Sequence, residues 1–457
     1  MRFLRYTGRP RPEDAMLKSA LDDNQFVILD PWSDADGNIA WHFMLDGKRA
    51  RVPLRAHARD LFDLAAMVYV ADEIVPRASG SDLWTREFEF TLPVFDEGKW
   101  EVAESSLAAC LGFLSGDRYR FRWLDRPNTA PARTTHRHRL RAEYDVVCLF
   151  SGGVDSLLGA ALLLASGRRV LLVGHYADGV TSSAQKDLFA LLHRKYPGKV
   201  SLLQVHVARS LARNHRYPLP DKVEISHRSR SFLFLAVGTA VATAIGVSPL
   251  FIPENGLIAL NAPLGASRRG TLSTRTAHPR YIEQFNGVLR NLGFDIVVEN
   301  PFVHQSKTDM VQAIGDSDIR AALLRSVSCA HAGNLRWESQ QNVTHCGYCV
   351  PCLYRRVAFL AADLEESGYL YDVFTVLPDL SADRARDLRL LVRFARATEH
   401  AREIDLIATV LRHGGFSGGQ NGDEYTARAE MLKRWARAFM DLTRQRSNAR
   451  TRRILGI

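Results

Sequence analysis

Between residues 144 and 300, short apolar runs alternate with longer stretches of mixed polarity. The first apolar run has no polar positions, which is typical of a strand covered on both faces. Because strands and helices take turns, the pattern predicts an α/β domain with a parallel, doubly wound sheet. Ligands of such a sheet bind at the carboxyl ends of its strands. The predicted strands are Val146–Phe150, Arg169–Gly174, Val200–Val207, Leu250–Pro253 and Phe294–Val298, and the predicted helices are Val154–Ala165, Thr181–Lys195, Ser229–Ile245 and Arg280–Leu292.

The first 126 residues follow another pattern, which predicts a separate α+β module. Two apolar runs flank Asp36-Gly37, a dipeptide that favours the turn of a β-hairpin. Two later stretches alternate strictly between apolar and polar residues, as half-buried strands do. The hairpin strands are Phe26–Leu29 and Trp41–Leu45, the later strands are Phe88–Leu92 and Tyr119–Trp123, and a helix is predicted at Trp100–Leu114.

Residues 127–142 combine prolines with a basic, apolar-poor run, and they predict a linker. After residue 368, apolar residues recur at helical spacing, interrupted by the glycine-rich segment Gly414–Gly422. The predicted organisation is an N-terminal accessory domain (1–126), a basic linker (127–142), an α/β core (143–368) and a C-terminal helical extension (369–457).

The composition is that of an ordinary globular enzyme, with 46% hydrophobic and 24% charged residues among 457. The longest apolar stretch, Phe232–Ile245, is too short for a membrane-spanning helix. The first five residues include two arginines and no apolar leader. We therefore expect a cytoplasmic protein without a membrane partner.

The formal net charge of +10 is concentrated in two places, a run at Arg133–Arg141 and a basic tail at Lys433–Arg453. Such clusters attract nucleic acid or acidic partners. The alternative, which we favour, is a solvated helix face that ends in a frayed tail. No aromatic residues alternate with the basic ones of the tail, as stacking platforms for bases would. Nucleic acid stays an open partner.

A candidate phosphate site, Ser151-Gly152-Gly153-Val154-Asp155-Ser156, follows the first strand of the core. The glycines let the backbone turn sharply, and the free N–H groups at the start of the next helix form a cradle for an anion. Asp155 fits such a place when Mg²⁺ accompanies the phosphate. The loop is neither a Walker A nor a dinucleotide-binding motif. The competing interpretation is an ordinary strand-to-helix turn with local capping.

Four of the six cysteines gather in one region, at Cys329, Cys346, Cys349 and Cys352. Two successive Cys-x-x-Cys steps with one cysteine upstream supply four thiolates, which favours a closed tetrahedral zinc site. Gly347 permits the tight turn between ligands. An iron–sulfur cluster uses the same ligands and is the main rival, while a chance grouping of buried thiols fits the regular spacing poorly.

The loop matches the Ser-Gly-Gly-x-Asp-Ser signature of the pyrophosphate-loop ATP pyrophosphatases, and with the cysteine motif the chain resembles the QueC family, the 7-cyano-7-deazaguanine synthases. The resemblance covers roughly residues 144–360 and is most specific at these two motifs. It implies a sheet of the adenine-nucleotide α-hydrolase (HUP, PP-loop) type with a four-cysteine zinc site. The matching segments are Phe150–Leu157, Arg228–Leu233, Pro301–Lys307 and Cys346–Phe359.

The resemblance implies ATP, Mg²⁺ and Zn²⁺ as cofactors and, with the position of each residue, a set of roles. ATP binding falls to Ser151, Gly152, Gly153, Asp155, Ser156, His175, Arg228 and Arg230, catalysis to Asp155, Ser156 and Lys307, substrate binding to Glu254, Asn255, Asn261 and His278, and zinc binding to Cys329, Cys346, Cys349 and Cys352. Plain alternatives stand beside several roles. His175 is then a solvated residue, His278 a helix cap, the arginines surface charges, and Glu254 and Asn255 loop structure.

QueC enzymes adenylate the carboxylate of 7-carboxy-7-deazaguanine, form its amide with ammonia, and use a second ATP to make the nitrile. This chain is much longer, and its segments Pro253–Pro263, His175–Gly179 and Thr276–Pro279 depart from theirs. In these respects it is similar to the QueC-like proteins of bacterial antiphage systems, those of the Qat system first and of CBASS operons second.

That similarity implies an ATP-dependent carbon–nitrogen ligase, forming AMP and pyrophosphate, that conjugates a deazaguanine acid to an amine of a partner protein. The alternatives are a 7-cyano-7-deazaguanine synthase of nucleobase or tRNA modification, a tRNA-thiolating enzyme, and a nucleotide-binding component of a defence complex without turnover. The resemblance allows a homodimer. The sequence does not identify the acceptor or the final product.

Overall fold

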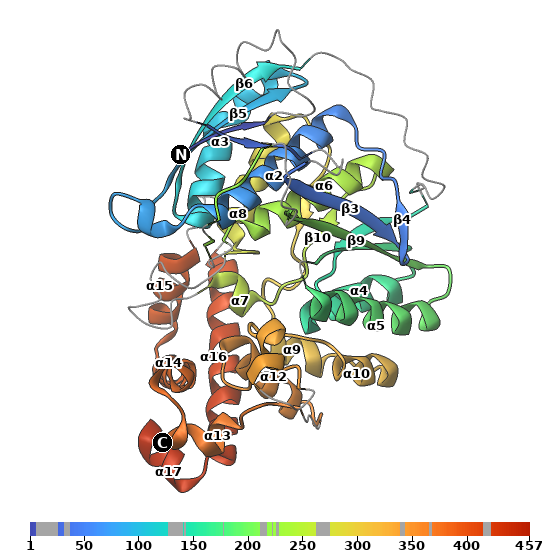
Figure 1. The fold of residues 1–457 in the computed structure, drawn as a ribbon. Helices are drawn as coiled ribbons and strands as arrows, with labels where there is room; N and C mark the ends of the chain where they lie inside the picture. The colour runs from blue at the N-terminus through green and yellow to red at the C-terminus, as the bar shows by residue number, and fades with distance from the viewer. Residues whose placement is uncertain are drawn as a thin grey trace.

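The computed structural model of the protein describes residues 1–5, 26–31, 37–126, 140, 143–176, 178–210, 217–221, 223–224, 228–261, 275–338, 343–364, 368–414 and 422–457. Almost all of the predicted linker, the arginines of the run Arg133–Arg141 and most of the segment Gly414–Gly422 lie outside these residues. The described chain forms two β-sheets above a group of C-terminal helices (Figure 1).

In the described part of the chain, the larger sheet has seven strands in the order β11-β10-β7-β8-β9-β3-β4. Strands β7 to β11 run parallel, so the predicted parallel α/β sheet is confirmed. The order of connection reverses between β7 and β10. Such a reversal opens a crevice at the carboxyl ends of the two strands, where ligands bind. The strands are β7 (Val146–Leu149), β8 (Val170–His175), β9 (Val200–Arg209), β10 (Leu250–Phe251) and β11 (Val298–Glu299), the last two shorter than predicted.

The two faces of this sheet bury different layers. Val146 and Cys148 of β7 pack with α4 and α5, whereas Val147 and Leu149 pack with α6 and α2 on the other face. Coverage on both faces explains why the strand has no polar positions. The helices are α2 (Ala56–Ile74), α4 (Val154–Ala165), α5 (Gly179–Lys195) and α6 (Arg230–Ile245), of which α4 has its predicted bounds.

The smaller sheet belongs to the N-terminal residues and has four parallel strands, in the order β2-β1-β5-β6, within the described chain. β5 and β6 contain the two alternating strands that the sequence predicts, and α3 is the predicted helix between them. α3 packs against α8 of the core. The elements are β1 (Arg2–Arg5), β2 (Phe26–Leu29), β5 (Glu87–Val94), α3 (Glu97–Ser115), β6 (Arg118–Asp125) and α8 (Pro279–Asn291), with a short 3₁₀ turn, η1 (Arg77–Ser79), before β5.

The hairpin predicted around Asp36-Gly37 is wrong, because its two strands lie in different sheets. β2 pairs in parallel with β1, whereas β3 (Ile39–Leu45) runs antiparallel to β9 along its whole length. The true hairpin joins β3 to β4 (Lys48–Ala50) through Asp46 and Gly47, with positive φ angles of 47° and 81°. The N-terminal residues thus complete the edge of the core sheet, unlike the wholly separate module that the pattern predicts. The domain boundary near residue 126 stays a prediction.

Helix α2 is a buried helix that the sequence pattern did not reveal. It lacks the polar face that makes helical periodicity visible, because even Asp60, Asp63 and Asp72 are buried within the fold. α2 packs along α6 and so joins the N-terminal residues to the core.

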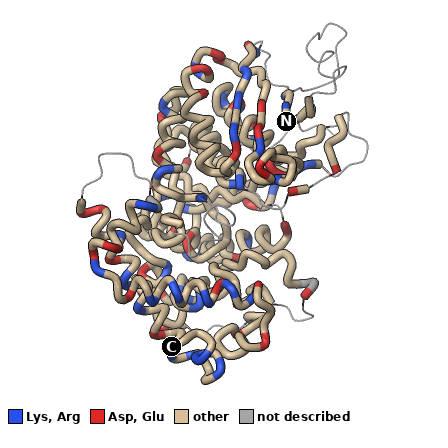
Figure 2. Tube along the Cα trace, turned by 90° about the vertical axis from the view of Figure 1, so that its left-hand side faces the viewer, with Lys and Arg blue, Asp and Glu red and all other residues tan. Residues whose placement is uncertain are grey.

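The C-terminal helices pack around an apolar cluster that includes Leu388 of α14 and Trp435 and Phe439 of α16. α17 begins after Asn448, whose side chain accepts a hydrogen bond from Thr451 N at 2.9 Å. The frayed tail that we favoured is therefore wrong, since the basic residues lie on two packed helices (Figure 2). The helices here are α13 (Val373–Val376), α14 (Ala382–His400), α15 (Glu403–Gly414), α16 (Gly422–Arg446) and α17 (Ala449–Leu455), with the turn η4 (Leu377–Asp379).

Short helices complete the core around the crevice and the cysteine region. They are α7 (Gly256–Leu260), α9 (Lys307–Gln312), α10 (Ser317–Leu323), α11 (Leu335–Glu338) and α12 (Val350–Leu360), with the turn η3 (Ala332–Asn334). Among the described residues, no helix combines the length and apolar character needed to cross a bilayer.

Candidate functional site

The loop between β7 and α4 has the geometry of an anion cradle. Gly152 has a positive φ of 83°, and a Cβ atom there would lie 3.1 Å from the backbone nitrogen of Gln185, so the position favours glycine. Ser151 Oγ accepts a hydrogen bond from Gly153 N at 3.3 Å and donates to Ser156 Oγ at 3.2 Å. Ser156 Oγ donates in turn to Gly153 O at 3.0 Å. These hydroxyls fix the loop at the positive end of the α4 dipole.

The segment before the cysteine motif braces this loop. Val327 N donates to Gly152 O at 3.0 Å, and Ser328 Oγ accepts from the first N–H of α4 at 3.5 Å. Arg355 of α12 is fully buried and donates to Ser326 Oγ at 2.6 Å. The phosphate loop and the cysteine region are therefore in direct contact, although they lie far apart in the sequence.

Asp155 is the centre of a buried polar cluster in the crevice. Its carboxylate pairs with the Lys307 ammonium, and both side chains are buried. Asn255 donates to the same carboxylate through its side chain at 2.6 Å and its backbone N–H at 3.1 Å. Lys307 opens α9 after the capping residue Ser306, and Asn255 caps α7. Two helix starts thus bring donors to Asp155.

Glu254 is the second carboxyl group of this cluster. Its carboxyl donates a hydrogen bond to Asp155, and Asn255 Nδ2 lies 3.3 Å from its Oε1 atom. Asn300 holds its backbone from both sides, donating to the Glu254 carbonyl at 2.7 Å and accepting from its N–H at 3.3 Å. Burial and then the charge of Asp155 raise the pKa of Glu254 well above its usual range.

Asp155 has the opposite shift. Burial by itself would raise the pKa of Asp155, but the Lys307 ammonium and the hydrogen bonds from Glu254 and Asn255 hold it below the usual range. The cluster therefore favours the ionised form of Asp155 and the protonated form of Glu254, a combination that often marks a functional site. An ionised carboxylate beside an anion cradle suits the cation of a nucleotide phosphate, and Lys307 suits a phosphate oxygen.

Three residues predicted to bind ATP lie on the α2 and α6 side of the sheet. The His175 ring packs between Tyr69 of α2 and Phe234 of α6, with centroids 5.6 and 5.3 Å away, and its Nε2 atom lies 3.1 Å from Val207 O. The alternative of a solvated His175 is wrong, because the side chain is buried. Among the described contacts, neither His175 nor the two arginines Arg228 and Arg230 reach the phosphate loop, and their ATP role stays a prediction.

Two residues predicted to bind substrate have local structural roles. Asn261 ends α7 with a left-handed φ of 48°. His278 caps α8 by accepting a hydrogen bond from Arg280 N at 3.2 Å, and its ring lies 5.0 Å from that of Phe113. The interpretation of His278 as a helix cap is therefore confirmed. A substrate role for Asn261 or His278 stays a prediction, whereas Glu254 and Asn255 lie beside Asp155.

The four cysteines converge as their spacing predicts. Cys346 Sγ lies 3.9 Å from Cys352 Sγ, and the ligand atoms of Cys329, His331, Cys346 and Cys349 lie within 4.8 Å of one another. Backbone N–H groups point at the sulfurs, from Cys346 to Cys329 Sγ at 3.3 Å and from Cys349 to Cys346 Sγ at 3.4 Å. Converging thiols with N–H donors fit a metal-thiolate site, so this cluster can hold a metal ion such as zinc.

Sequence reasoning missed three residues of this region, Asn300, Ser328 and His331. A signal existed for Asn300, because it lies two residues after the last predicted strand, where polar residues serve ligands or loops. His331 lies two residues after Cys329, close enough to have been weighed as a fifth candidate ligand. Ser328 had no signal, because its contact with α4 depends on the packing of two distant segments.

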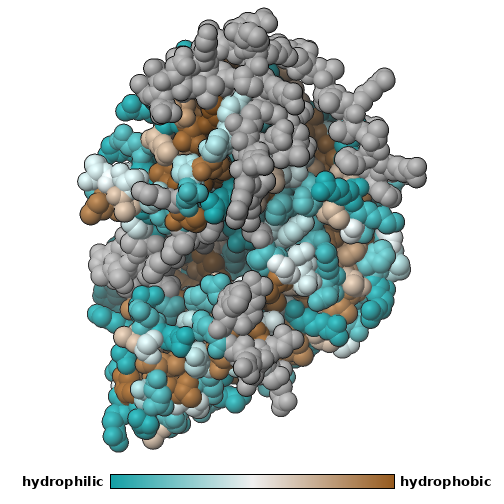
Figure 3. Space-filling model, in the orientation of Figure 1, coloured by the Kyte–Doolittle hydropathy of each residue, from teal (hydrophilic) through white to brown (hydrophobic). Residues whose placement is uncertain are grey.

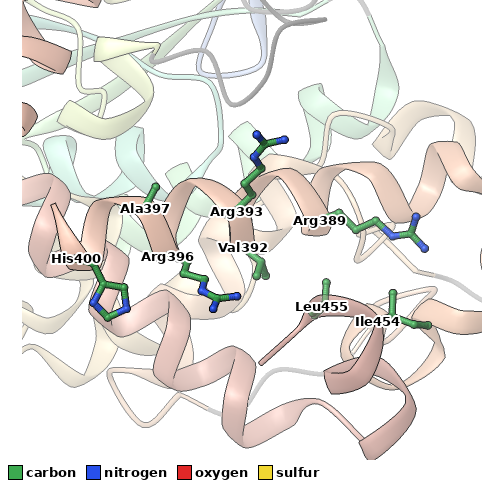
Figure 4. Close-up of a pocket in the computed structure, with 8 residues that line it drawn as sticks. All are labelled: Arg389, Val392, Arg393, Arg396, Ala397, His400, Ile454 and Leu455. Atoms are coloured by element: carbon green, nitrogen blue, oxygen red, sulfur yellow. The ribbon is translucent and has the colours of Figure 1, made fainter.

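A groove of about 490 Å³ lies away from this site, between α14 and α17 (Figure 4). Arg396 points to the side of α14 on which Ile454 and Leu455 lie, whereas Arg393 points to the opposite side (Figure 4). Hydrophobic residues also gather on this part of the surface, at the lower left of the space-filling view (Figure 3). The lining residues are Arg389, Val392, Arg393, Arg396, Ala397, His400, Ile454 and Leu455.

The fold and site together define an α/β protein with a parallel sheet, a glycine-rich loop at its switch point and a cysteine cluster that can hold a metal ion. The family model described as Queuosine biosynthesis protein QueC matches residues 276–363, which include Lys307 and the four cysteines. The chain is 25% identical over 240 residues to the 7-cyano-7-deazaguanine synthase of Methanothrix thermoacetophila and 27% identical over 248 residues to that of Methanoculleus marisnigri. Each match covers 48% of this chain and 96% of the relative. The chain is thus QueC-like over about half of its length, which supports an enzyme of the QueC type.

Proposed function

We propose that the protein is an ATP-dependent carbon–nitrogen ligase that activates the carboxylate of 7-carboxy-7-deazaguanine, or of a similar acid, and then forms an amide. The observation that carries this proposal is the meeting of the glycine-rich loop with Asp155, Glu254 and Lys307 at the switch point of the sheet. The similarity to two 7-cyano-7-deazaguanine synthases supports an acid of the deazaguanine class.

In the proposed reaction, a carboxylate oxygen of the acid attacks the α-phosphorus of ATP, and the bond to the bridging oxygen breaks as pyrophosphate leaves. An amine then attacks the acyl carbonyl, loses a proton and displaces AMP. A bound Mg²⁺ would supply neutralisation of phosphate charge, and Asp155 and Glu254 are the carboxyl ligands available to hold it. The loop N–H groups and Lys307 orient the phosphates and stabilise the charge that develops on them.

The proposed zinc site is structural. Four cysteine ligands leave no open position for a substrate, so the metal would fix local geometry and take no part in the chemistry. Its place supports this role, because Ser328 precedes Cys329 directly and touches the start of α4. The metal would then hold the phosphate loop in position through the backbone.

We propose further that the acceptor is an amine of a partner protein in an antiphage defence system. The matched relatives cover 48% of this chain, so about half of it has no counterpart in them. The smaller sheet and the C-terminal helices extend the molecule on opposite sides of the core (Figure 1). Added surface of this extent supports a protein acceptor over ammonia.

Two alternative functions predict different outcomes of one assay. Purified protein is incubated with ATP, Mg²⁺ and 7-carboxy-7-deazaguanine, and released pyrophosphate is measured. Acid-dependent release is expected, and Asp155→Asn and Lys307→Met should each abolish it. Lys195→Met, which changes a partly exposed lysine of the same core, should not. Binding of ATP without any release would favour a nucleotide-binding component of a defence complex and overturn the ligase.

The acceptor is tested separately by mass spectrometry. Proteins encoded beside this chain are co-expressed with it and with a source of the acid, and their intact masses are compared with those from the Asp155→Asn strain. A mass increase equal to the acyl group is expected on one partner. Unmodified partners together with a nitrile product in the small-molecule fraction would favour a 7-cyano-7-deazaguanine synthase.

A further inference from the structure

Among the residues that the structure describes, Arg228 is a buried cation without a counter-ion. Its side chain, just before α6, is only 7% exposed, and its Nη2 atom is shielded from solvent with no acceptor. No hydrogen bond or ion pair of this guanidinium occurs within the described part of the chain. A guanidinium has five N–H donors, and buried charges in proteins are normally paired because desolvation is costly.

The N-terminal residues hold Arg228 in place without neutralising it. The guanidinium carbon lies 4.7 Å from the ring centroid of Trp84, and Arg77 lies 4.8 Å from the same ring. A cation that lies over an aromatic face is attracted by the electrons of the ring, but the ring carries no net negative charge. Trp84 precedes β5, in a part of the chain that the sequence pattern left without any functional role.

The nearby carboxylates are already committed to other partners. Asp117 accepts two hydrogen bonds from Arg77, at 3.1 and 3.2 Å, and three from Arg86, the shortest at 2.7 Å. Asp72 pairs with Arg86 through one oxygen, and its other oxygen accepts from Ser229 N at 2.8 Å and Ser229 Oγ at 2.9 Å. Two carboxylates therefore serve two other arginines, and neither bonds to Arg228.

A fourth arginine adds to the positive charge. Arg275 donates to the Phe113 carbonyl and stacks on the Phe113 ring, with its guanidinium carbon 4.3 Å from the centroid. Burial, and then the charges of Arg77 and Arg275 against those of Asp117 and Asp72, lower the pKa of Arg228 to about 10.

We propose that Arg228, held on Trp84 by the N-terminal residues, binds an oxyanion of the ligand, either the carboxylate of the acid substrate or a phosphate of the nucleotide. The inference rests on the proposed function for these two sources of the anion. Arg228 precedes α6, whose first residues lie beside the carboxyl end of β8, the edge of the sheet at which ligands bind. The N-terminal residues are then part of the binding site and more than a cover for the sheet.

The test uses Arg228→Met, which keeps an apolar side chain against Trp84 and removes the charge. The control is Arg290→Met, an exposed arginine on α8. Calorimetric titrations measure the affinity of each full-length protein for 7-carboxy-7-deazaguanine, for ATP with Mg²⁺ and for inorganic phosphate. Loss of a charge-assisted contact should weaken binding of one oxyanion roughly 10- to 100-fold, and the ligand that is affected identifies its source.

A second measurement separates binding from a structural role. Without ligand, Arg228→Met should melt at the wild-type temperature or above it, because the substitution removes a buried unpaired charge. A clear fall in melting temperature, unchanged affinity for all three ligands, or a wild-type protein that binds none of them would each overturn the proposal. If the wild-type protein releases no pyrophosphate but binds phosphate, and Arg228→Met no longer binds it, the proposed ligase activity is wrong and the anion site is supported. If Arg228→Met turns over as wild type does, the anion site fails and the ligase stands.

Discussion

Asp155 and Lys307 form an ion pair in which both side chains are buried from solvent, so each charge is neutralised by the other and not by water. Breaking a buried ion pair by removing one partner leaves an uncompensated charge, which is far more costly than losing a pair at the surface. The pair is also poised for ligands, since a nucleotide phosphate with its cation offers each group a new partner of the proper sign.

Lys307→Met should therefore destabilise the fold by about 3–5 kcal/mol at pH 8, because Asp155 is left as a buried, unpaired carboxylate. The wild-type pKa of Asp155 is depressed, so the stability from this pair is present above the usual carboxyl pKa and lost as pH falls through the folded value. In the variant, the deficit should shrink at pH 5 because the carboxylate takes up a proton. Urea unfolding of wild type and Lys307→Met at both pH values measures this difference in the free energy of unfolding.

The matched control is Lys195→Met, which removes a partly exposed lysine that pairs with the exposed carboxylates of Asp316 and Asp318. Its unfolding midpoint should stay close to wild type at both pH values, because solvent screens such pairs. A deficit of Lys307→Met that is the same at pH 5 and pH 8 would contradict the role of the Asp155 charge.

His175 is a second group whose lowered pKa makes the fold less stable in acid. Burial and then the charge of Arg230 lower the pKa of His175 to about 3, whereas an unfolded histidine titrates near 6.5. The folded chain thus binds fewer protons than the unfolded chain between these values, so stability falls as pH decreases below about 6.5.

His175→Gln should reduce the slope of the free energy of unfolding against pH by up to about 1.4 kcal/mol per pH unit between pH 6 and pH 4. The glutamine amide retains a donor for Val207 O, which keeps other losses independent of pH. Urea unfolding at half-unit steps gives the slope. His193→Gln, at an exposed position on α5, is the control and should keep the wild-type slope; an equally steep limb in His175→Gln would refute the assignment.

At the residue scale, the sequence identifies groups whose chemistry is tied to a motif and misplaces those whose role depends on orientation. Asp155, Lys307 and the cysteines lie where their motifs predict, in a crevice and in a cluster. His175 directly follows the predicted strand, but its ring points to the face covered by α2, a helix the pattern did not reveal. Which face a strand residue occupies depends on packing partners, so the solvated His175 could not be excluded in advance.

Among the elements, the turn between Cys346 and Cys349 is the most constrained. Gly347 has a positive φ of 86°, and a Cβ atom there would lie 1.9 Å from the Tyr371 carbonyl oxygen. The residues after α12 therefore close over this turn, and glycine serves both the backbone conformation and the space.

Gly347→Ala should displace this turn and lower the metal content of the purified protein, measured by elemental mass spectrometry, well below one ion per chain. Gly368→Ala is the control, because its φ of 95° is equally strained while no atom lies within 4 Å of the added Cβ. Equal metal content in the two variants would show that the contact with Tyr371 does not shape the site. Treatment of wild type with a zinc chelator should expose four reactive thiols.

The elements show why periodicity works in one part of the chain and fails in another. The strands β7, β8 and β9 and the helices beside them appear close to their predicted bounds because each has either an unbroken apolar run or a clear amphipathic face. The hairpin was placed at Asp36-Gly37, although Asp46-Gly47 has the same composition and forms the turn. Local turn chemistry cannot distinguish two such sites when the strand partners lie in different sheets.

At the scale of the whole molecule, the N-terminal residues and the core share one apolar interior. α2 packs on α6, and one continuous cluster runs from Phe62 and Tyr69 to Phe232 and Phe285. A core without its N-terminal residues would therefore expose this face and the edge of β9.

A chain beginning at residue 143 should aggregate or fail to accumulate, even though it retains all the motifs of the QueC-like region. Size-exclusion chromatography of this fragment and of a chain ending at residue 447, which lacks only α17, tests the point. The second fragment should elute as the full chain does, because α17 packs at the periphery of the C-terminal helices. A well-behaved fragment from residue 143 would show that the domain boundary near residue 126 is a true one.

Long-range geometry sets the limit of what the sequence alone conveys. Asp155 and Lys307 lie 152 positions apart, and Asn255 lies 100 positions from Asp155. The sequence predicts their proximity only through the general rule that residues after parallel strands gather at one edge of the sheet. The partnership of Trp84 with Arg228 follows from no such rule, because it joins the N-terminal residues to the core.

The antiparallel edge of the larger sheet affects how the chain folds while it is being synthesised. Ile39 of β3 pairs with Arg209 of β9, so the partner residue is synthesised 209 − 39, or 170, residues later. At about 5–20 residues per second, this delay is roughly 10–30 s. In that interval β3 and β4 have only each other, and an isolated hairpin is marginal in water. The charges of Lys48 and Arg49 on β4 discourage pairing with the strands of other nascent chains during the wait.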